Sequence, residues 1–159
     1  MKILVTGGAG YVGSILIPML LKDNHEVILL DNFMWGIKPI LSFVQDRKLS
    51  LAVGDIRDPR VVKPAIAKAD AILHLAAIVG YPACAADENL AETVNVKGTR
   101  LLCKMAAKGQ KLIFASTGST YGQVEGIANE STPINPLTLY GRTKREGEKM
   151  ILEKDGVCL

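Results

Sequence analysis

The chain has 159 residues, a length that suits one domain and leaves little room for a second. Hydrophobic residues make up 48 % and charged residues 22 %, so the chain can bury a sizeable core and is not disordered as a whole. The net charge of +3 comes from 19 basic and 16 acidic residues mixed along the chain, so we expect no nucleic-acid partner.

Short apolar runs that end at glycine, aspartate or polar residues predict six buried strands. These runs span residues 2–6, 27–30, 49–53, 71–77, 111–115 and 157–159. Helical patterns separate them. The apolar stripe of the first helix consists of Val12, Ile15, Leu16, Met19 and Leu20.

Three further helices follow in the same alternation. A short one covers residues 61–67, a longer one ends near Gly109, and a charged one begins near Tyr140. The longer helix has a stripe formed by Val94, Gly98, Leu101, Leu102 and Met105. Residues 118–137, rich in Gly, Ser, Thr and Pro, predict a long loop of the kind that is often functional.

This alternation predicts an α/β fold with a parallel sheet covered by helices on both faces. Right-handed crossovers make such a sheet doubly wound, as in Rossmann-type domains. Because the chain stops inside a predicted strand, we expect residues 1–159 to be one domain that is truncated. The apolar surface left uncovered predicts a homo-oligomer.

A glycine-rich turn joins the first strand to the first helix. Gly7, Gly10 and Gly13 have the spacing GxxGxxG. The first glycine allows a tight turn, the second lets a pyrophosphate approach the backbone, and the third lets helix and strand pack closely. The helix N-terminus then presents free N–H groups to the phosphates. A glycine triplet alone is a weak signal, but its place between strand and helix favours a dinucleotide site.

Two aspartates at strand ends extend this prediction. Asp31 follows the second strand, where a carboxylate accepts hydrogen bonds from the adenosine ribose and repels a 2′-phosphate, which favours NAD over NADP. The alternative for Asp31 is a helix cap or a turn residue. Asp55 and Ile56 follow the third strand and are candidates for the adenine edge, with a plain turn aspartate as the alternative.

Tyr140 and Lys144 are four residues apart on a predicted helix and therefore share one face. A tyrosine acting as a base near pH 7 needs its pKa lowered by about 3 units, or about 4 kcal/mol. An ammonium about 4 Å away supplies about 4 kcal/mol at an effective dielectric of about 20. The same spacing also arises by chance in many helices. Thr117, with Ser116 as a weaker candidate, follows the fifth strand, where its hydroxyl can bind a substrate oxygen.

The chain resembles the extended short-chain dehydrogenase/reductases, and within them the NAD-dependent nucleotide-sugar epimerase/dehydratase group. The resemblance covers essentially the whole chain. It rests on landmarks that occur in the expected order, namely Thr-Gly-Gly-Ala-Gly-Tyr-Val-Gly at 6–13, Asp31, Gly54-Asp55-Ile56, His74-Leu75-Ala76-Ala77, Asn95, Ser116-Thr117 before Tyr121-Gly122, and Tyr140-Gly-Arg-Thr-Lys144.

The resemblance implies bound NAD and a nucleotide-sugar substrate. Tyr140 would be the general base and acid, Lys144 would bind the ribose and lower the tyrosine pKa, and Thr117 would contact the sugar hydroxyl. The implied cofactor-binding residues are Gly7, Gly10, Tyr11, Val12, Gly13, Asp31, Asn32, Asp55, Ile56, Leu75, Ala76, Ala77, Asn95, Tyr140 and Lys144. Asn95 supports the active-site backbone in relatives.

Two departures qualify the implied reaction. Gly118 and Ser119 follow Thr117, where 4,6-dehydratases have Asp and Glu, which favours epimerisation or simple oxidoreduction over dehydration. The resemblance also implies a C-terminal substrate-binding part, which we expect to lie outside these 159 residues. The alternative function is therefore a non-catalytic NAD-binding module, such as a redox sensor or an assembly subunit.

The cysteines and the hydropathy bear on compartment and metals. Three cysteines without paired spacing predict reduced thiols rather than disulfides, and two isolated histidines predict no metal site. No signal peptide is visible, and no apolar run approaches the roughly 20 residues that span a bilayer. We therefore expect a cytoplasmic protein without a membrane partner.

Overall fold

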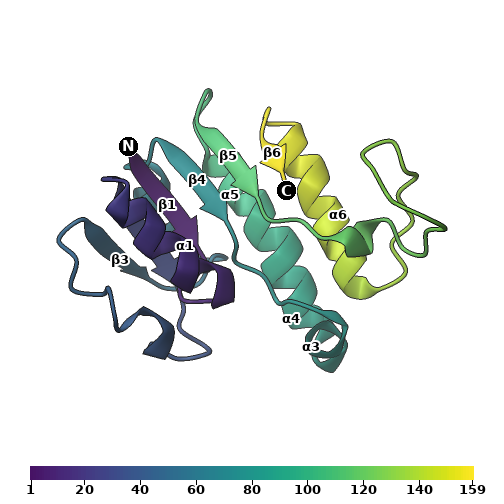
Figure 1. Cartoon of the computed structure of the whole chain (residues 1–159), viewed down its shortest axis with the longest axis horizontal. Coiled ribbons are helices and arrows are strands. Elements are labelled where there is room, and N and C mark those ends of the chain that lie inside the picture. Colours follow the sequence, from purple (N-terminus) through teal and green to yellow (C-terminus); the bar gives the residue numbers. More distant parts are fainter.

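Six parallel strands form one sheet in the computed structural model of the chain, which describes residues 1–159 (Figure 1). The strands are β1 (Lys2–Thr6), β2 (Glu26–Asp31), β3 (Leu49–Val53), β4 (Ala71–His74), β5 (Lys111–Phe114) and β6 (Val157–Cys158). Their order across the sheet is β3-β2-β1-β4-β5-β6. The order reverses between β1 and β4, which confirms the predicted doubly wound α/β fold.

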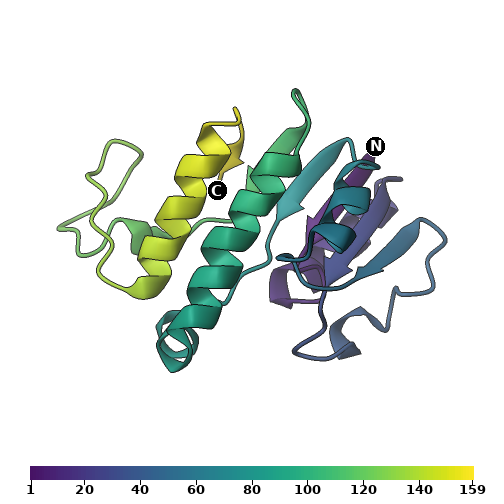
Figure 2. The same cartoon turned by 180° about the vertical axis from the view of Figure 1, so that it is seen from behind.

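Helices cover the two faces of this sheet unequally. They are α1 (Tyr11–Lys22), α2 (Pro59–Ile66), α3 (Tyr81–Ala86), α4 (Glu88–Glu92), α5 (Thr99–Met105) and α6 (Leu139–Leu152), with short 3-10 turns η1 (Lys38–Ile40) and η3 (Gly118–Thr120). A π-helical segment η2 (Thr93–Gly98) joins α4 to α5. Figure 1 shows α1 on one face, and Figure 2 shows α5 and α6 across the other. None of these helices is long and apolar enough to cross a membrane.

The buried residues fall into two clusters on opposite faces of the sheet. The larger cluster lies under α2, α5 and α6 and includes Leu4, Ile72, Leu102 and Phe114. The smaller one lies under α1 and includes Val5, Ile17 and Leu29. Leu4 and Val5 are neighbours in β1 and point to opposite faces, as expected for a strand buried on both sides.

The predicted face of the first helix was wrong. Gly13, Ile17 and Leu21 are the buried residues of α1, whereas Ile15 and Met19 are 55 % and 58 % exposed. Because apolar residues lie all around this helix, the pattern fits more than one face. The close contact of Gly13 with the backbone of Gly8 selects the face that is buried.

Strand β4 is shorter than predicted and ends at His74. Residues 75–77 leave the sheet, although the Leu75 amide still donates to the Thr6 carbonyl at 3.1 Å. The apolar run does not distinguish a strand from an apolar loop that lines a cavity. Helix α3 and the π-helical turn were not predicted either, since neither has a distinct sequence pattern.

One part of the sheet has no helix over it. On the face that carries α1, Val5 pairs in register with Leu73, and Leu73 with Ile113, which in turn pairs with Val157. Leu73 and Ile113 are half-buried, and Val157 is 54 % exposed. Figure 1 shows this open face over β4, β5 and β6.

Candidate functional site

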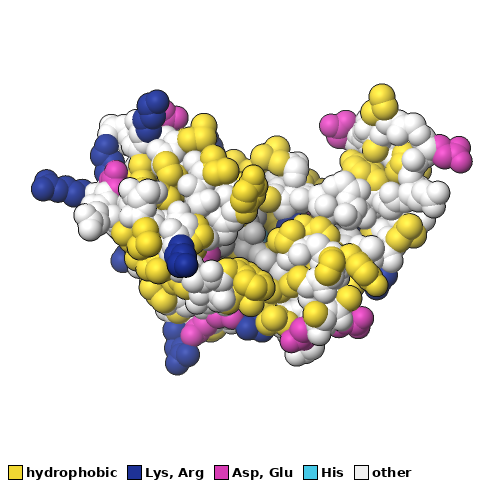
Figure 3. Space-filling model, turned by 60° about the horizontal axis from the view of Figure 1, so that its bottom comes forward, with side chains coloured by type: hydrophobic (Ala, Val, Ile, Leu, Met, Phe, Trp, Pro, Cys, Tyr) yellow, Lys and Arg dark blue, Asp and Glu magenta, His cyan; other side chains and the backbone are white.

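A cavity of about 480 Å³ lies at the carboxyl ends of the strands, where the strand order reverses. In parallel α/β sheets, this is the position where ligands bind. Figure 3 shows it as the hollow between two lobes, with hydrophobic side chains along its walls. All but one of the predicted cofactor-binding residues line it, namely Gly7, Gly10, Tyr11, Val12, Gly13, Asp31, Asn32, Asp55, Ile56, Leu75, Ala76, Ala77, Tyr140 and Lys144.

The glycine-rich turn opens α1 toward this cavity. Gly7 has a φ of +68°, and a Cβ there would lie 2.7 Å from Cα of Ala76, so only glycine fits. The first backbone hydrogen bond of α1 runs from the Ser14 amide to the Gly10 carbonyl at 2.9 Å. The amides of residues 11–13 therefore have no backbone acceptor, and no acidic side chain occupies the first turn. This arrangement suits an anionic ligand.

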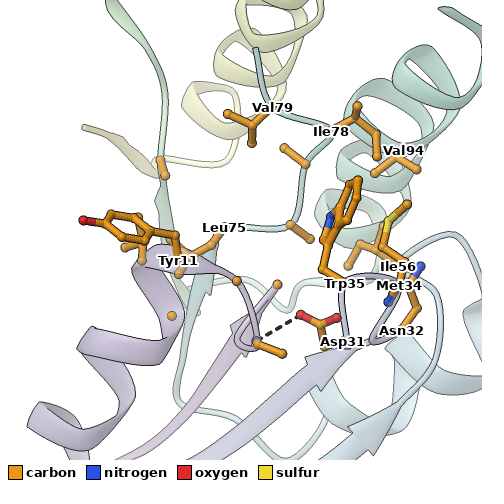
Figure 4. Close-up of a pocket in the computed structure, with 18 of the residues that line it drawn as sticks. Tyr11, Asp31, Asn32, Met34, Trp35, Ile56, Leu75, Ile78, Val79 and Val94 are labelled. Carbon is orange, nitrogen blue, oxygen red and sulfur yellow. Dashed lines mark hydrogen bonds between the residues drawn. The ribbon is translucent and has the colours of Figure 1, made fainter. Parts of the chain in front are cut away.

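Asp31 connects the glycine-rich turn to the loop after β2. Its Oδ2 accepts from the Ala9 amide at 3.0 Å, drawn as the dashed line in Figure 4, and its Oδ1 accepts from the Phe33 amide at 2.8 Å. Each oxygen keeps a lone pair for a ligand hydroxyl. Asp31 is therefore a turn residue, which was the alternative from the sequence, and it also lines the cavity.

Asp55 is more fully engaged within the protein. Its two carboxylate oxygens accept from Nε and Nη2 of Arg57 at 2.8 and 2.6 Å, and Oδ1 also accepts from the Arg57 amide. The hydrogen bond from the Arg57 side chain lowers the pKa of this carboxyl. Arg57 also donates to the Thr93 hydroxyl at 2.9 Å. The Asp55 side chain therefore holds Arg57 against the π-helical segment. This is the role of a turn aspartate, the alternative to a contact with adenine.

Asn95 is the one predicted cofactor-binding residue that does not line the cavity. It is 2 % exposed, and its side chain holds the backbone of Ile78. Oδ1 accepts from the Ile78 amide at 2.8 Å, while Nδ2 donates to the Ile78 carbonyl at 3.0 Å and to Thr143 Oγ1 at 3.1 Å. Since Ile78 lines the cavity and Thr143 belongs to α6, Asn95 connects a cavity wall to the helix that carries Tyr140.

Tyr140 is half-buried at the start of α6, on the cavity wall. Burial raises its pKa, and the Thr117 hydroxyl acts in the opposite direction. The charge of Lys144 does not contribute to this shift, and the lowering of the Tyr140 pKa by Lys144 stays a prediction. The Lys144 ammonium lies over the ring of Phe114 on β5, 3.8 Å from the ring centroid.

Lys144 is only 3 % exposed. Burial lowers its pKa to about 8, whereas the charges of Cys158 and Glu148 act to raise it. No carboxylate lies within ion-pair distance of its ammonium, so the Phe114 ring is its partner through a cation–π contact. A buried ammonium that lines a cavity without an anionic partner is suited to bind a polar ligand.

The end of β5 adds two hydroxyl groups. Ser116 lines the cavity, and its Oγ donates to Oε1 of Glu148 at 2.5 Å. Thr117 lies outside the lining set and caps η3, where its Oγ1 accepts from the Ser119 amide at 3.2 Å. Thr117 is still close enough to affect the pKa of Tyr140, so the two predicted catalytic side chains are neighbours.

Several residues of the cavity wall are not predicted from the sequence. They include Ala9, Leu30, Met34, Gly36, Ile78, Val79, Leu90, Val94 and Ala115. Met34 belongs to the loop after β2, next to Asp31, and Trp35 of the same loop also lines the cavity. Leu90 belongs to α4 and Val94 to the π-helical segment η2, and only the fold brings them to the cavity, where Figure 4 shows Val94.

Comparison with known proteins places this cavity in a family context. The model of the NAD dependent epimerase/dehydratase family matches residues 3–155. A probable UDP-arabinose 4-epimerase from Oryza sativa subsp. japonica is 36 % identical over 95 % of this chain. A UDP-glucose 4-epimerase from Halalkalibacterium halodurans is 38 % identical over 94 % of it. The chain spans 38 % and 45 % of the lengths of these two relatives.

The fold is also similar to solved structures. A UDP-glucuronic acid 4-epimerase from Bacillus cereus, in complex with UDP-glucuronic acid and NAD, has a TM-score of 0.92 at 30 % identity. The match covers 99 % of this chain and 55 % of that one.

Proposed function

Because the chain belongs to the NAD-dependent epimerase/dehydratase family, we propose that it is the cofactor-binding and catalytic part of an epimerase that acts on a nucleotide sugar. One observation carries the proposal. The free amides of α1, the Asp31 carboxylate, the Tyr140 phenol and the Lys144 ammonium all face one cavity. The named relatives are 4-epimerases of UDP-sugars, which favours reaction at the sugar C4 hydroxyl.

The residues of the cavity fit NAD. The amides at the start of α1 would hold the pyrophosphate. Asp31 would accept hydrogen bonds from the hydroxyls of the adenosine ribose, and its negative charge would repel a 2′-phosphate. Lys144 would donate to the second ribose. When bound, NAD supplies the acceptor, and later the donor, of the hydride that leaves the sugar carbon.

Tyr140 is the residue that would accept the proton of the reacting hydroxyl. Its Oη would take that proton as the carbon–oxygen double bond forms, and it would return the proton when the keto group is reduced from the opposite side. The Thr117 hydroxyl, which already affects the Tyr140 pKa, would hold the same sugar oxygen by a hydrogen bond. A phenol whose pKa is raised by burial needs a nearby positive charge to act as a base. Lys144 is the cation of α6 that lines the cavity, and it would have to supply this charge from a position other than the one over the Phe114 ring.

A second candidate function is a non-catalytic NAD-binding module. It is favoured by the Tyr140 phenol, because burial raises its pKa and a phenol of this kind is a poor base at neutral pH. Such a module would bind NAD through the same cavity and turn over no nucleotide sugar. The presence of Thr117, Tyr140 and Lys144 in one site favours the enzyme.

The test combines binding with turnover. Calorimetry measures NAD affinity, and proton NMR detects the C4 epimer after incubation with UDP-glucose, UDP-galactose or UDP-arabinose. Tyr140→Phe is expected to lower turnover by about 100-fold or more, as for loss of a general base, while NAD affinity changes little. Tyr121→Phe, a tyrosine outside the cavity lining, is the matched control and should keep full turnover.

Each outcome separates the alternatives. NAD binding without any epimer, in the unmodified chain, would select the non-catalytic module. Absence of NAD binding would refute both candidates. Self-association stays a prediction of the open apolar face over β4 to β6, and light scattering measures it, with a monodisperse monomer as the contrary result.

A further inference from the structure

Trp35, the only tryptophan of the chain, is 76 % exposed and lines the cavity. An indole ring left in water forgoes the stabilisation that its large apolar surface gains on burial. Figure 4 shows the ring standing above Asp31, on the same side of the cavity as Met34, Ile56 and Val94.

The loop that carries Trp35 is tied to Asp31. The Phe33 amide donates to Asp31 Oδ1 at 2.8 Å, and the Gly36 amide donates to the Phe33 carbonyl at 2.8 Å. Phe33 and Gly36 have φ values of 54° and 89°, so the chain turns sharply on both sides of Trp35. These contacts place the indole beside the carboxylate that would bind a ribose.

The wall next to the indole is apolar. Ile56 is 5 % exposed and Val94 is 8 % exposed, and both line the cavity from elements packed into the larger core cluster. Met34, which is 48 % exposed, lies on the Trp35 side. Together, Trp35, Met34, Ile56 and Val94 form an apolar part of the cavity lining beside Asp31, which we call the slot.

We propose that Trp35 is the aromatic wall of an adenine subsite and stacks on the purine ring of the bound dinucleotide. The inference rests on the NAD-binding function proposed above. The Asp31 carboxylate fixes the position of the ribose, and the base attached to that ribose lies on the side away from the glycine-rich turn, where the slot is found. A planar purine covers the exposed indole face and fills the space toward Ile56.

A fluorescence titration tests the stacking directly, because the chain has one tryptophan and every change in indole emission reports on residue 35. The probes are NAD, AMP and nicotinamide mononucleotide, each added to the complete chain after removal of co-purified nucleotide. NAD and AMP are expected to quench the emission along the same curve that calorimetry gives for binding. Nicotinamide mononucleotide, which has no purine, is expected to leave the emission unchanged.

Variants measure the contribution to affinity. Trp35→Ala should weaken AMP and NAD binding about tenfold, which corresponds to about 1.4 kcal/mol, within the range known for base–aromatic stacking. Trp35→Phe retains an aromatic face and should recover most of the affinity. Tyr81→Ala is the matched control, since Tyr81 is an aromatic residue that is 63 % exposed and lies outside the cavity lining.

The outcomes distinguish this inference from the function on which it rests. If calorimetry shows NAD binding while the indole emission and the Trp35→Ala affinity stay unchanged, the stacking role is wrong and the NAD site stands. Equal quenching by AMP and nicotinamide mononucleotide also overturns the adenine assignment. If NAD does not bind at all, the proposed function fails first. Circular dichroism of Trp35→Ala verifies folding, and the Trp35→Phe affinity decides the question if Trp35→Ala is unfolded.

Discussion

The Nε2 atom of His74 lies 2.8 Å from the hydroxyl of Thr99, and the imidazole must be the donor in this hydrogen bond. The Thr99 hydroxyl uses its own proton to donate to the Asn95 carbonyl at 2.6 Å, since a carbonyl only accepts. Nδ1 of the neutral ring is then an acceptor, and it receives the Thr6 hydroxyl proton at 2.7 Å. Thr6 in turn accepts from the Ala76 amide. A directed chain of hydrogen bonds thus runs from the cavity wall to the π-helical segment.

We predict that His74 stays neutral, with its proton on Nε2, across the working range of the protein. Burial lowers its pKa to about 3, and the Lys144 charge adds to this effect. Nitrogen-15 NMR of the imidazole rings between about pH 8 and about pH 4.5 should show one ring in a single tautomer throughout. His25, the only other histidine, gives the second set of signals. A His74 signal that titrates in this range would contradict the assigned bond directions.

The same pKa shift predicts acid sensitivity. In the unfolded chain His74 takes up a proton below about pH 6.5, whereas in the folded chain it does so only near pH 3. Stability from this residue is therefore complete above about pH 6.5 and falls by about 1.4 kcal/mol per pH unit below it. Urea unfolding at about pH 6.5 and about pH 4.5 measures the slope. His74→Gln, which does not titrate, should have a shallower slope, and equal slopes would show that His74 does not contribute.

We predict that Lys144 lowers the stability of the fold and contributes to NAD binding. Its pKa falls from 10.5 to about 8 on folding, so at neutral pH the folded chain carries the full cost of a buried ammonium. Stability from this residue rises between about pH 8 and about pH 10.5, where the unfolded chain alone keeps the proton. We expect Lys144→Met to stabilise the fold by about 1 to 2 kcal/mol at pH 7, after loss of the contact with Phe114, and to weaken NAD binding.

Urea unfolding and calorimetry on the same preparations measure both effects of Lys144→Met. Lys149→Met is the control, because Lys149 is exposed on the same helix and pairs with Glu146 at the surface. It should change neither stability nor NAD affinity appreciably. A Lys144→Met variant less stable than the unmodified chain would show that the ammonium is better compensated than its surroundings indicate.

Substitution by alanine should lower the free energy of unfolding at Gly7 and leave it unchanged at Gly118. A Cβ at Gly7 meets the Ala76 backbone at 2.7 Å and needs a φ of +68°, whereas a Cβ at Gly118 meets nothing within 4 Å. Gly7→Ala is expected to cost about 2 to 4 kcal/mol, the sum of backbone strain and overpacking, and to abolish NAD binding. Gly118→Ala is expected to be neutral in urea unfolding. Comparable losses for the two variants would show that the strain at Gly7 is relieved by movement of the loop.

The features that could be predicted from the sequence are those with a local signal. The glycine-rich turn, Asp31 and the alternation of strands and helices each depend on a few neighbouring residues, and the doubly wound sheet and the cavity position followed from them. Prediction from the sequence failed where tertiary contacts decide. The face of α1 depends on Gly13 against Gly8, and the position of the Lys144 ammonium depends on Phe114, a residue on a distant strand. Neither partner is visible in the local pattern.

The last prediction concerns Asn95, whose amide is matched to both polar groups of the Ile78 backbone. Asn95→Ala leaves the buried Ile78 N–H without a partner and leaves the Ile78 carbonyl with only the weak Cys84 thiol donor, at a cost of about 2 to 4 kcal/mol. In Asn95→Asp, one carboxylate oxygen still accepts from the Ile78 amide, but the other faces the Ile78 carbonyl and cannot donate to it. At pH 7 we therefore expect the aspartate variant to be no more stable than the alanine variant.

Acid should rescue the aspartate variant alone, because protonation turns the second oxygen into a donor toward the Ile78 carbonyl. A buried carboxyl of this kind has a raised pKa, so its contribution to stability grows as pH falls toward about 5. Urea midpoints at about pH 7 and about pH 5, compared with Asn89→Asp on the exposed side of α4, measure the rescue. If Asn95→Asp loses stability on acidification in parallel with Asn89→Asp, its side chain is not clamped to Ile78, and the connection from the cavity wall to α6 does not depend on this amide.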